Sequence, residues 1–244
     1  MPKSGSTYLH TVLREITGLD DASLCELGDQ NEGDICEKRL RRLRRRSVIQ
    51  QHVKATQTNL KWLSHYGVRP IVQTRSLFDV LPSLHDHFER EQNGLPCGYI
   101  GREFWDLSWN DRMEYLIRIH LPWYLNFLLS WHEAAKRIET CPIAYEELFA
   151  DPFNTIMRTL DFYRVSTSRQ QIAAAMVRTG QRNTRFNVGT SGRGTELLTN
   201  RHKRMIQDLA ATCGFRISVT GSVATASPAA GIPDAVRPAV RRAA

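Results

Sequence analysis

The sequence predicts an α/β fold, one domain in which helices flank a mostly parallel central sheet. Short β-rich runs alternate along the chain with amphipathic helical stretches, the order that produces parallel sheets covered by helices. With 244 residues, 41% of them apolar, the chain can bury one substantial core. We expect this domain to span residues 1–216, and the Ala-, Pro- and Ser-rich residues 217–244 to be a disordered tail.

Individual elements are predicted from the spacing of apolar side chains. Residues 89–112, rich in Gly, Pro and aromatic side chains, are expected to form an irregular insertion, either a lid over a substrate or a plain surface loop. Strands are expected at 47–51, 68–74 and 140–145. Helices are expected at 7–16, 59–63, 77–88, 113–137 (kinked or split by Pro122), from Pro152 to about Tyr163 with Asp151 as N-cap, and after Thr199.

The overall charge predicts a protein that binds anions. The formal net charge is +8, which attracts phosphates, sulfates, nucleic acid or anionic lipid. The basic run at residues 38–46 is either a solvated helix face or a surface for an acidic partner. Five scattered cysteines without a CxxC pair argue against a disulfide framework or a zinc site. No stretch reaches the roughly 18 apolar residues of a membrane span, so we expect a cytoplasmic location, unless an upstream targeting or membrane segment exists.

A phosphate-binding loop is predicted at the beginning of the chain. Lys3, Ser4, Gly5, Ser6 and Thr7 open an amphipathic helix, where unpaired backbone N–H groups and the helix dipole favour an anion. Gly allows close approach and Lys adds charge. The string fails the GxxxxGK[ST] pattern of an ATPase because its Lys precedes a single Gly. Such a loop normally leaves a buried strand, so we expect the first strand to be missing or truncated.

A second anion site is predicted between Arg75 and Ser83. Arg75 leaves a predicted strand and Ser83 follows eight residues later in the next predicted helix, so both can converge on one phosphate. Two anion sites suit a nucleotide that is phosphorylated at both ends. Asp79, between them, can cap or pair locally as readily as it can serve the site.

Two segments resemble signatures of the sulfotransferase family. PKSGSTYL at residues 2–9 is similar to its 5′-phosphosulfate loop, and RSLFDVLPS at residues 75–83 is similar to its 3′-phosphate motif. His52 lies about where many members carry the catalytic histidine. The resemblance runs in the family's order from residue 2 to about residue 215.

Two later segments match in the same order. AYEEL at residues 144–148 is similar to a family segment whose tyrosine lies by the adenine in cytosolic members, which implies that role for Tyr145. Gly192, Arg193 and Gly194 resemble the late glycine-rich segment that returns to the 3′-phosphate. Where many members have Arg-Lys before the late glycine this chain has Asn-Val, so either Arg185 or Arg193 is expected to contact that phosphate.

The resemblance implies a P-loop-like fold and an in-line transfer of a sulfuryl group from 3′-phosphoadenosine 5′-phosphosulfate (PAPS) without a metal. It implies that His52 accepts the proton of an acceptor hydroxyl or amine and that Lys3 stabilises charge on the leaving phosphate. The acceptor is expected to be a small molecule or a glycan, nucleic acid is not expected, and the oligomeric state is open. Two alternatives stay open: another P-loop-like nucleotide-dependent transferase or kinase, and a non-enzymatic basic protein that binds anions through residues 38–46.

Overall fold

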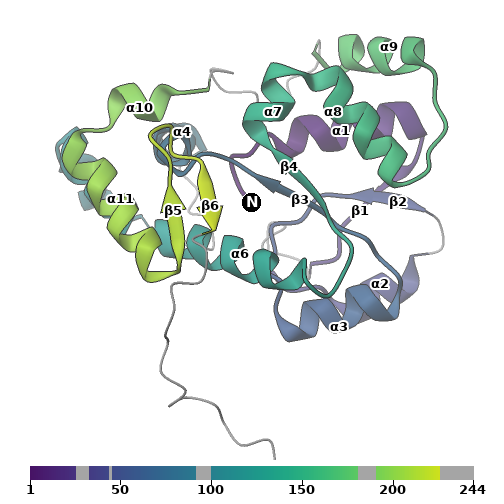
Figure 1. Ribbon diagram of the computed structural model, residues 1–244, viewed down its shortest axis with the longest axis horizontal. Helices are drawn as coiled ribbons and strands as arrows, with labels where there is room; N and C mark the ends of the chain where they lie inside the picture. Colours follow the sequence, from purple (N-terminus) through teal and green to yellow (C-terminus); the bar gives the residue numbers. More distant parts are fainter. Residues whose placement is uncertain (26–32, 44–45, 92–99, 181–190, 226–244) are drawn as a thin grey trace, which may run out of the picture.

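The computed structural model describes residues 1–25, 33–43, 46–91, 100–180 and 191–225, which form the predicted α/β fold (Figure 1). The strands are β1 (Asp20–Ala22), β2 (Ser47–Ile49), β3 (Ile71–Thr74), β4 (Cys141–Ala144), β5 (Phe215–Ile217) and β6 (Val223–Thr225). The helices are α1 (Ser6–Thr17), α2 (Glu37–Arg42), α3 (Gln57–His65), α4 (Leu77–Glu91), the 3-10 helix η1 (Arg102–Asp106), α5 (Trp109–Ile119), α6 (Leu121–Ala134), α7 (Tyr145–Ala150), α8 (Pro152–Phe162), α9 (Arg169–Gly180), α10 (Arg193–Leu197) and α11 (Asn200–Thr212).

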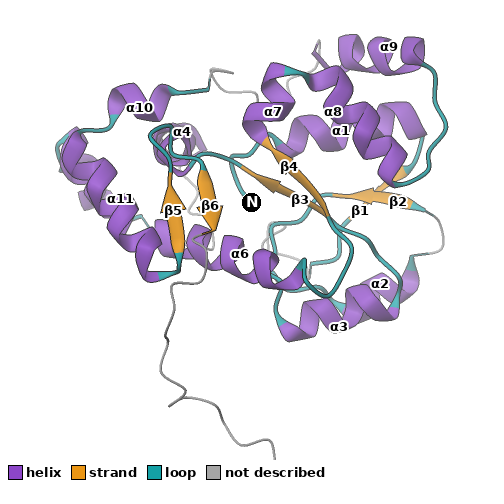
Figure 2. Cartoon of the chain, in the orientation of Figure 1, coloured by secondary structure: helices purple, strands orange, loops and turns teal. Residues whose placement is uncertain are grey.

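The parallel sheet is present as two parallel strand pairs, β1 with β2 and β3 with β4 (Figure 2). Each pair joins strands that are far apart in the sequence, as crossover connections require. Within the described residues, β2 and β3 are not paired with each other by backbone hydrogen bonds. Residues 1–5 form turns before α1, and the Met1 amino group donates to the Gln73 carbonyl oxygen of β3 at 2.8 Å.

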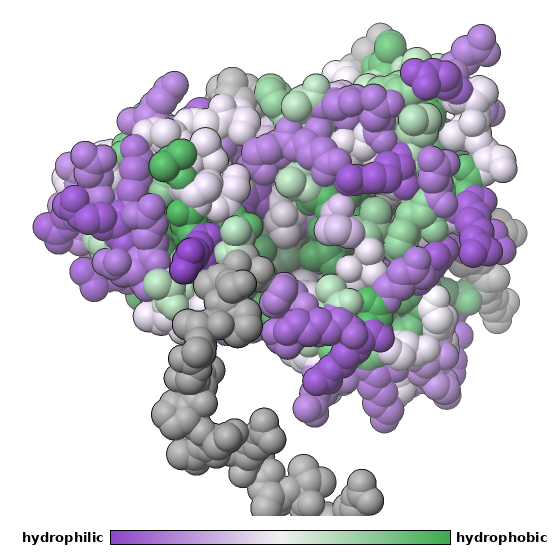
Figure 3. Space-filling model, in the orientation of Figure 1, coloured by the Kyte–Doolittle hydropathy of each residue, from purple (hydrophilic) through white to green (hydrophobic). Residues whose placement is uncertain are grey.

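Two hydrophobic cores lie on the two sides of these strands. The smaller core joins α1, α8 and α9 to β4, through residues such as Val12, Ile143 and Ile156. The larger core is built around α4, α5 and α6 and includes Leu81, Ile117 and the fully buried Tyr124 ring. Hydrophilic side chains cover the outer helices, while uncharged and apolar ones gather in the hollowed centre of the face drawn in Figure 3. The strands therefore lie between two apolar layers.

The helix predictions are confirmed where local signals were strong. Pro122 lies in the first turn of α6, directly after the end of α5, where its missing backbone N–H does not interrupt a helix. Asp151 accepts from the Asn154 amide at 3.2 Å as the N-cap of α8. Thr199 likewise caps α11. The predicted insertion is partly helical, since α4 reaches Glu91 and residues 102–106 form η1; residues 92–99 lie outside the described part.

The predicted tail begins too early. Residues 215–225 form an antiparallel hairpin in which β6 pairs with β5, with Ile217 opposite Val223. The turn of this hairpin packs against Phe78, which composition alone did not indicate. The rest of the predicted tail, 226–244, lies outside the described residues.

Among the helices that the structure describes, none is both long and apolar enough to cross a membrane.

Candidate functional site

The loop before α1 has the shape of an anion cradle. Lys3 (φ 61°) and Gly5 (φ 76°) both adopt left-handed backbone angles, so the chain curls and turns successive N–H groups in one direction. Gly5 is the N-cap of α1 and offers no side-chain cap, and the first turn of α1 carries no acidic residue. A Cβ on Gly5 would lie 3.0 Å from Cδ2 of Tyr145. The backbone amides at this helix start are therefore suited to an external anion.

Amide side chains from the neighbouring strands hold the loop in place. Gln73 Nε2 donates to the Ser4 carbonyl at 2.6 Å, and the buried Ser4 hydroxyl donates to the Met1 carbonyl at 2.6 Å. Gln50 Nε2 donates to the hydroxyl oxygens of Ser6 (2.9 Å) and Thr7 (3.3 Å). The Ser4 side chain thus supports the loop from inside, whereas Ser6 and Thr7 keep their hydroxyl protons for a further acceptor.

Arg75 joins the second predicted site to the first. It directly follows β3, and its Nη1 donates to the Lys3 carbonyl at 2.9 Å. Its guanidinium lies 4.2 Å from the centre of the Tyr145 ring, a cation–π contact. The side chain is 9% exposed, and Nη2 is 4.0 Å from the Asp79 carboxylate. The loop, Arg75 and Tyr145 therefore form one continuous cluster.

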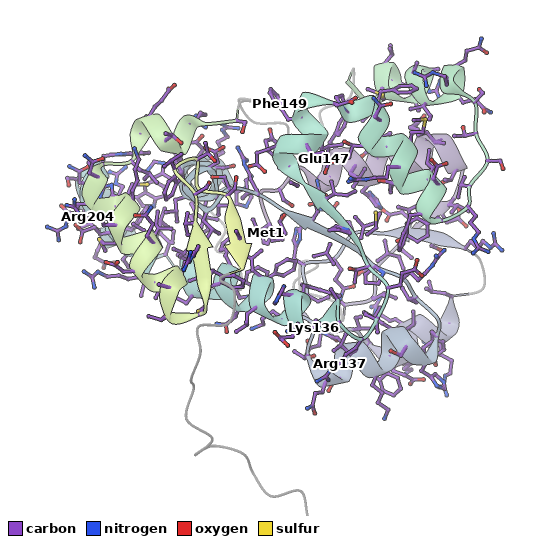
Figure 4. All side chains as sticks on the ribbon, in the orientation of Figure 1. Met1, Lys136, Arg137, Glu147, Phe149 and Arg204 are labelled. Carbon is purple, nitrogen blue, oxygen red and sulfur yellow. The ribbon has the colours of Figure 1, made fainter. Side chains whose placement is uncertain are left out.

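Tyr145 lies at the centre of this cluster. Burial raises the pKa of its phenol above the ordinary value of 10, so the group stays neutral. One helical turn further, the half-exposed Phe149 ring stacks against it with centroids 6.0 Å apart. Figure 4 shows Phe149 and Glu147 on α7, which lies above Met1 in this view. Phe149 was not predicted from the sequence; its spacing of four residues from Tyr145 was the available signal.

Predicted residues of the late glycine-rich segment bind protein carboxylates. Asp79 is 2% exposed and accepts from the amides of Gly192 (2.8 Å) and Gly194 (2.7 Å). Arg193 Nη1 pairs with Asp86 Oδ2 at 2.8 Å. Asp79 thus binds backbone amides that lie 113 and 115 positions away in the sequence, which neither of its two expected roles included. Arg185 lies outside the described residues.

Ser83 is 4% exposed within α4. It is buried in the second turn of the helix that follows Arg75. The structure thus brings Lys3, Gly5, Arg75 and Tyr145 together in one cluster. Ser83 lies further along α4.

His52 follows β2 and lines a cavity between β2 and β3. Burial, followed by the positive charges of the amino terminus and Lys3, lowers its pKa from 6.5 to about 3. The imidazole is therefore neutral and has a lone pair for a proton, but it is a weaker base than the sequence suggested. This cavity, which Leu9, Gln73 and Trp131 also line, has about 560 Å³ of empty space, part of it open to solvent.

The described residues include one cluster with metal-ligand chemistry, formed by His85, Asp86 and Glu89, whose ligand atoms lie within 4.8 Å of one another. Asp86 already pairs with Arg193, and His85 Nε2 lies 3.4 Å from Nη1 of Arg112. Two neighbouring guanidinium groups disfavour a further cation, so this cluster is explained by ion pairing.

Comparisons with known proteins support the fold. Family models and curated protein sequences give no match. Among solved structures, the mouse sulfotransferase SULT7A1 complexed with PAP is similar, with a TM-score of 0.65 and 19% sequence identity. The similarity covers 87% of this chain and 84% of that chain. This chain therefore has a sulfotransferase-like α/β fold, as its motifs predict.

Proposed function

We propose that this protein is a sulfotransferase that transfers a sulfuryl group from PAPS to a hydroxyl or amine of its acceptor. The observation that carries the proposal is the 2.9 Å hydrogen bond from Arg75 to the Lys3 carbonyl, because it brings two cationic, phosphate-type sites into contact. One nucleotide with a phosphate at each end can reach both. The fold similarity to a PAP-complexed sulfotransferase supports the same assignment.

The loop and Arg75 divide the binding of the nucleotide. The amides around Gly5, the Lys3 ammonium and the hydroxyls of Ser6 and Thr7 hold the 5′-phosphosulfate. Arg75 holds the 3′-phosphate, and the Tyr145 ring lies against the adenine. PAPS supplies an activated sulfur: the acceptor oxygen or nitrogen bonds to it as the bond from sulfur to the bridging phosphate oxygen breaks. Lys3 and the loop amides stabilise the charge that grows on that oxygen.

His52 takes the acceptor proton. Its lowered pKa results first from burial and then from the positive amino terminus and Lys3. Anionic phosphates and sulfate beside Lys3 offset those positive charges, so bound donor raises the pKa of His52. His52 therefore becomes a stronger base when the donor is bound. In the empty enzyme its low pKa keeps the imidazole unprotonated.

We assign no main phosphate contact to the glycine-rich segment at residues 192–194. Direct phosphate contacts from Gly192, Arg193 and Gly194 require Asp79 and Asp86 to give up hydrogen bonds of 2.7 to 2.8 Å. Arg75 lies further from Asp79, at 4.0 Å, so we assign the main 3′-phosphate contact to Arg75. The acceptor is a small molecule or a glycan, no metal takes part, and the protein is cytoplasmic.

Isothermal titration with 3′,5′-adenosine bisphosphate, the product of the donor, tests the proposal. We expect saturable binding in the presence of EDTA, and much weaker binding of ATP with magnesium. A folded protein that ignores the bisphosphate but binds Mg-ATP contradicts the proposal and favours the kinase alternative.

A further inference from the structure

We infer that the turn of the β5–β6 hairpin, residues 218–222, is a clamp that positions Arg75 for the nucleotide. The inference rests on the proposed function, in which Arg75 holds the 3′-phosphate. In Figure 1 this turn reaches the start of α4, far from the hairpin in sequence. The clamp would couple the docking of the hairpin to nucleotide binding.

Two hydrogen bonds attach the turn to the residues directly after Arg75. The Ser76 hydroxyl donates to the Thr220 carbonyl at 2.8 Å, across 144 positions of sequence. The Leu77 amide donates to the Gly221 carbonyl at 3.0 Å. Leu77 opens α4, where backbone amides have no acceptor within the helix. The hairpin supplies that acceptor and so fixes the direction in which α4 leaves Arg75.

The fit between the turn and α4 depends on a glycine. Gly221 is buried with φ +82°, and a Cβ there would lie 2.4 Å from Ser76 Oγ and 2.6 Å from Phe78 Cγ. The turn is held internally, since the Gly221 amide donates to the Ser218 carbonyl at 2.9 Å. A side chain at position 221 must therefore push the whole turn off α4.

A third segment holds the same junction from the other side. Glu146 Oε1, at the start of α7, accepts from the Ser76 amide at 2.8 Å. Its neighbour Tyr145 supplies the ring under the Arg75 guanidinium. Ser76 is thus fixed by α7 through its amide and by the hairpin through its hydroxyl. With Ser76 fixed on both sides, Arg75 has little backbone freedom.

Coupling of this kind is reciprocal. If hairpin docking favours the Arg75 position that binds phosphate, bound nucleotide must favour the docked hairpin. Amide hydrogen exchange at Leu77 and Gly221 should therefore slow when 3′,5′-adenosine bisphosphate binds. A glycine with a purely structural role would leave these amides unchanged by the ligand.

The test compares Gly221→Ala with Gly214→Ala. Both glycines have positive φ, but a Cβ on Gly214 would meet nothing within 4 Å, so both variants suffer backbone strain and only Gly221→Ala displaces the turn. We expect Gly221→Ala to weaken binding of 3′,5′-adenosine bisphosphate about tenfold or more and Gly214→Ala less than about threefold. Ligand-induced protection of the Leu77 amide should disappear only in Gly221→Ala.

If Gly221→Ala does not fold, Ser76→Ala takes its place, with the exposed Ser64→Ala as control. Ser76→Ala removes only the hydrogen bond to the Thr220 carbonyl and should weaken binding of the bisphosphate about threefold. Wild-type protein that binds the bisphosphate while the clamp variant tested binds like its control overturns the inference alone. Wild-type protein that does not bind it overturns the proposed function, and the clamp with it.

Discussion

The starts of α1 and α10 look alike in sequence and differ in what their amides bind. Each follows a glycine with positive φ, Gly5 at 76° and Gly192 at 94°, and neither has a side-chain cap from that residue. At α10 a buried carboxylate, Asp79, accepts from two of the amides. At α1 the first turn has no acidic residue, and Lys3 and Arg75 add positive charge beside it. The fold thus neutralises one helix start internally, and we propose that the other binds an external anion.

Removing the carboxylate at α10 should have the largest effect on stability. Asp79→Ala leaves the Gly192 and Gly194 amides without their acceptor, so we expect a loss of about 3 kcal/mol in the free energy of unfolding. Urea denaturation measures it, with the exposed Asp161→Ala as control. A loss below about 1 kcal/mol would mean that the α10 amides do not depend on Asp79.

Removing the proposed base beside α1 should affect catalysis most. His52→Ala should lower kcat about 100-fold and leave the affinity for 3′,5′-adenosine bisphosphate within about threefold, because the proton is transferred only in the reaction. The measurement is turnover with labelled PAPS and a panel of alcohols, phenols and glycans. Near-normal kcat would assign the proton transfer to another group.

The depressed pKa values of His52 and His120 predict acid sensitivity. Burial lowers the pKa of His52 to about 3 and that of His120 to about 4, against 6.5 for an exposed histidine. Between pH 6.5 and 4 the unfolded chain takes up protons that the folded protein does not. The free energy of unfolding should therefore fall with decreasing pH, by up to roughly 1.4 kcal/mol per pH unit for each histidine.

His120→Gln is the control for this slope, because it removes one of the two groups and does not touch the α1 loop. Chemical denaturation at several pH values should show a shallower fall in this variant. An equal slope with and without His120 would show that other groups govern acid stability.

The smallest predicted difference concerns the shape of the α1 loop. Gly5→Ala and Gly67→Ala both place a side chain at positive φ, and each should cost about 1 kcal/mol of stability. Only at Gly5 does a Cβ crowd Tyr145, at 3.0 Å. Gly5→Ala alone should therefore also weaken nucleotide binding, as measured by titration calorimetry. Equal binding by both variants would contradict the close approach proposed at this loop.

The sequence predicted those parts of the molecule whose signals are local. The amphipathic spacing of α1 and α4, and the capping residues Asp151 and Thr199, predict helices that the fold contains. The three-residue strands β1, β5 and β6 were not predicted. The equally short β2 was predicted, because it contains the β-branched pair Val48 and Ile49. The helices α7 and α9 were also not predicted.

The same distinction holds for the site. Lys3, Gly5, Arg75 and Tyr145 belong to ordered motifs, and the structure brings them into one cluster. The supporting contacts depend on folding: Asp79 meets Gly194 across 115 positions, and Gln73 meets Ser4 across 69. No periodicity or spacing connects such residues, so their roles could be assigned only from three-dimensional contacts.

The central claim is that the α1 loop and Arg75 bind one nucleotide through its 5′ and 3′ phosphates. The most direct test is the ratio of affinities for 3′,5′-adenosine bisphosphate and adenosine 5′-phosphate. Calorimetry measures this ratio in wild type, Arg75→Ala and Lys3→Ala. We expect wild type to prefer the bisphosphate by about 30-fold, equivalent to about 2 kcal/mol for one charge-assisted contact. Arg75→Ala should remove that preference, whereas Lys3→Ala should weaken both ligands and keep it. A preference that survives in Arg75→Ala, or is absent from wild type, would contradict the assignment of the 3′-phosphate to Arg75.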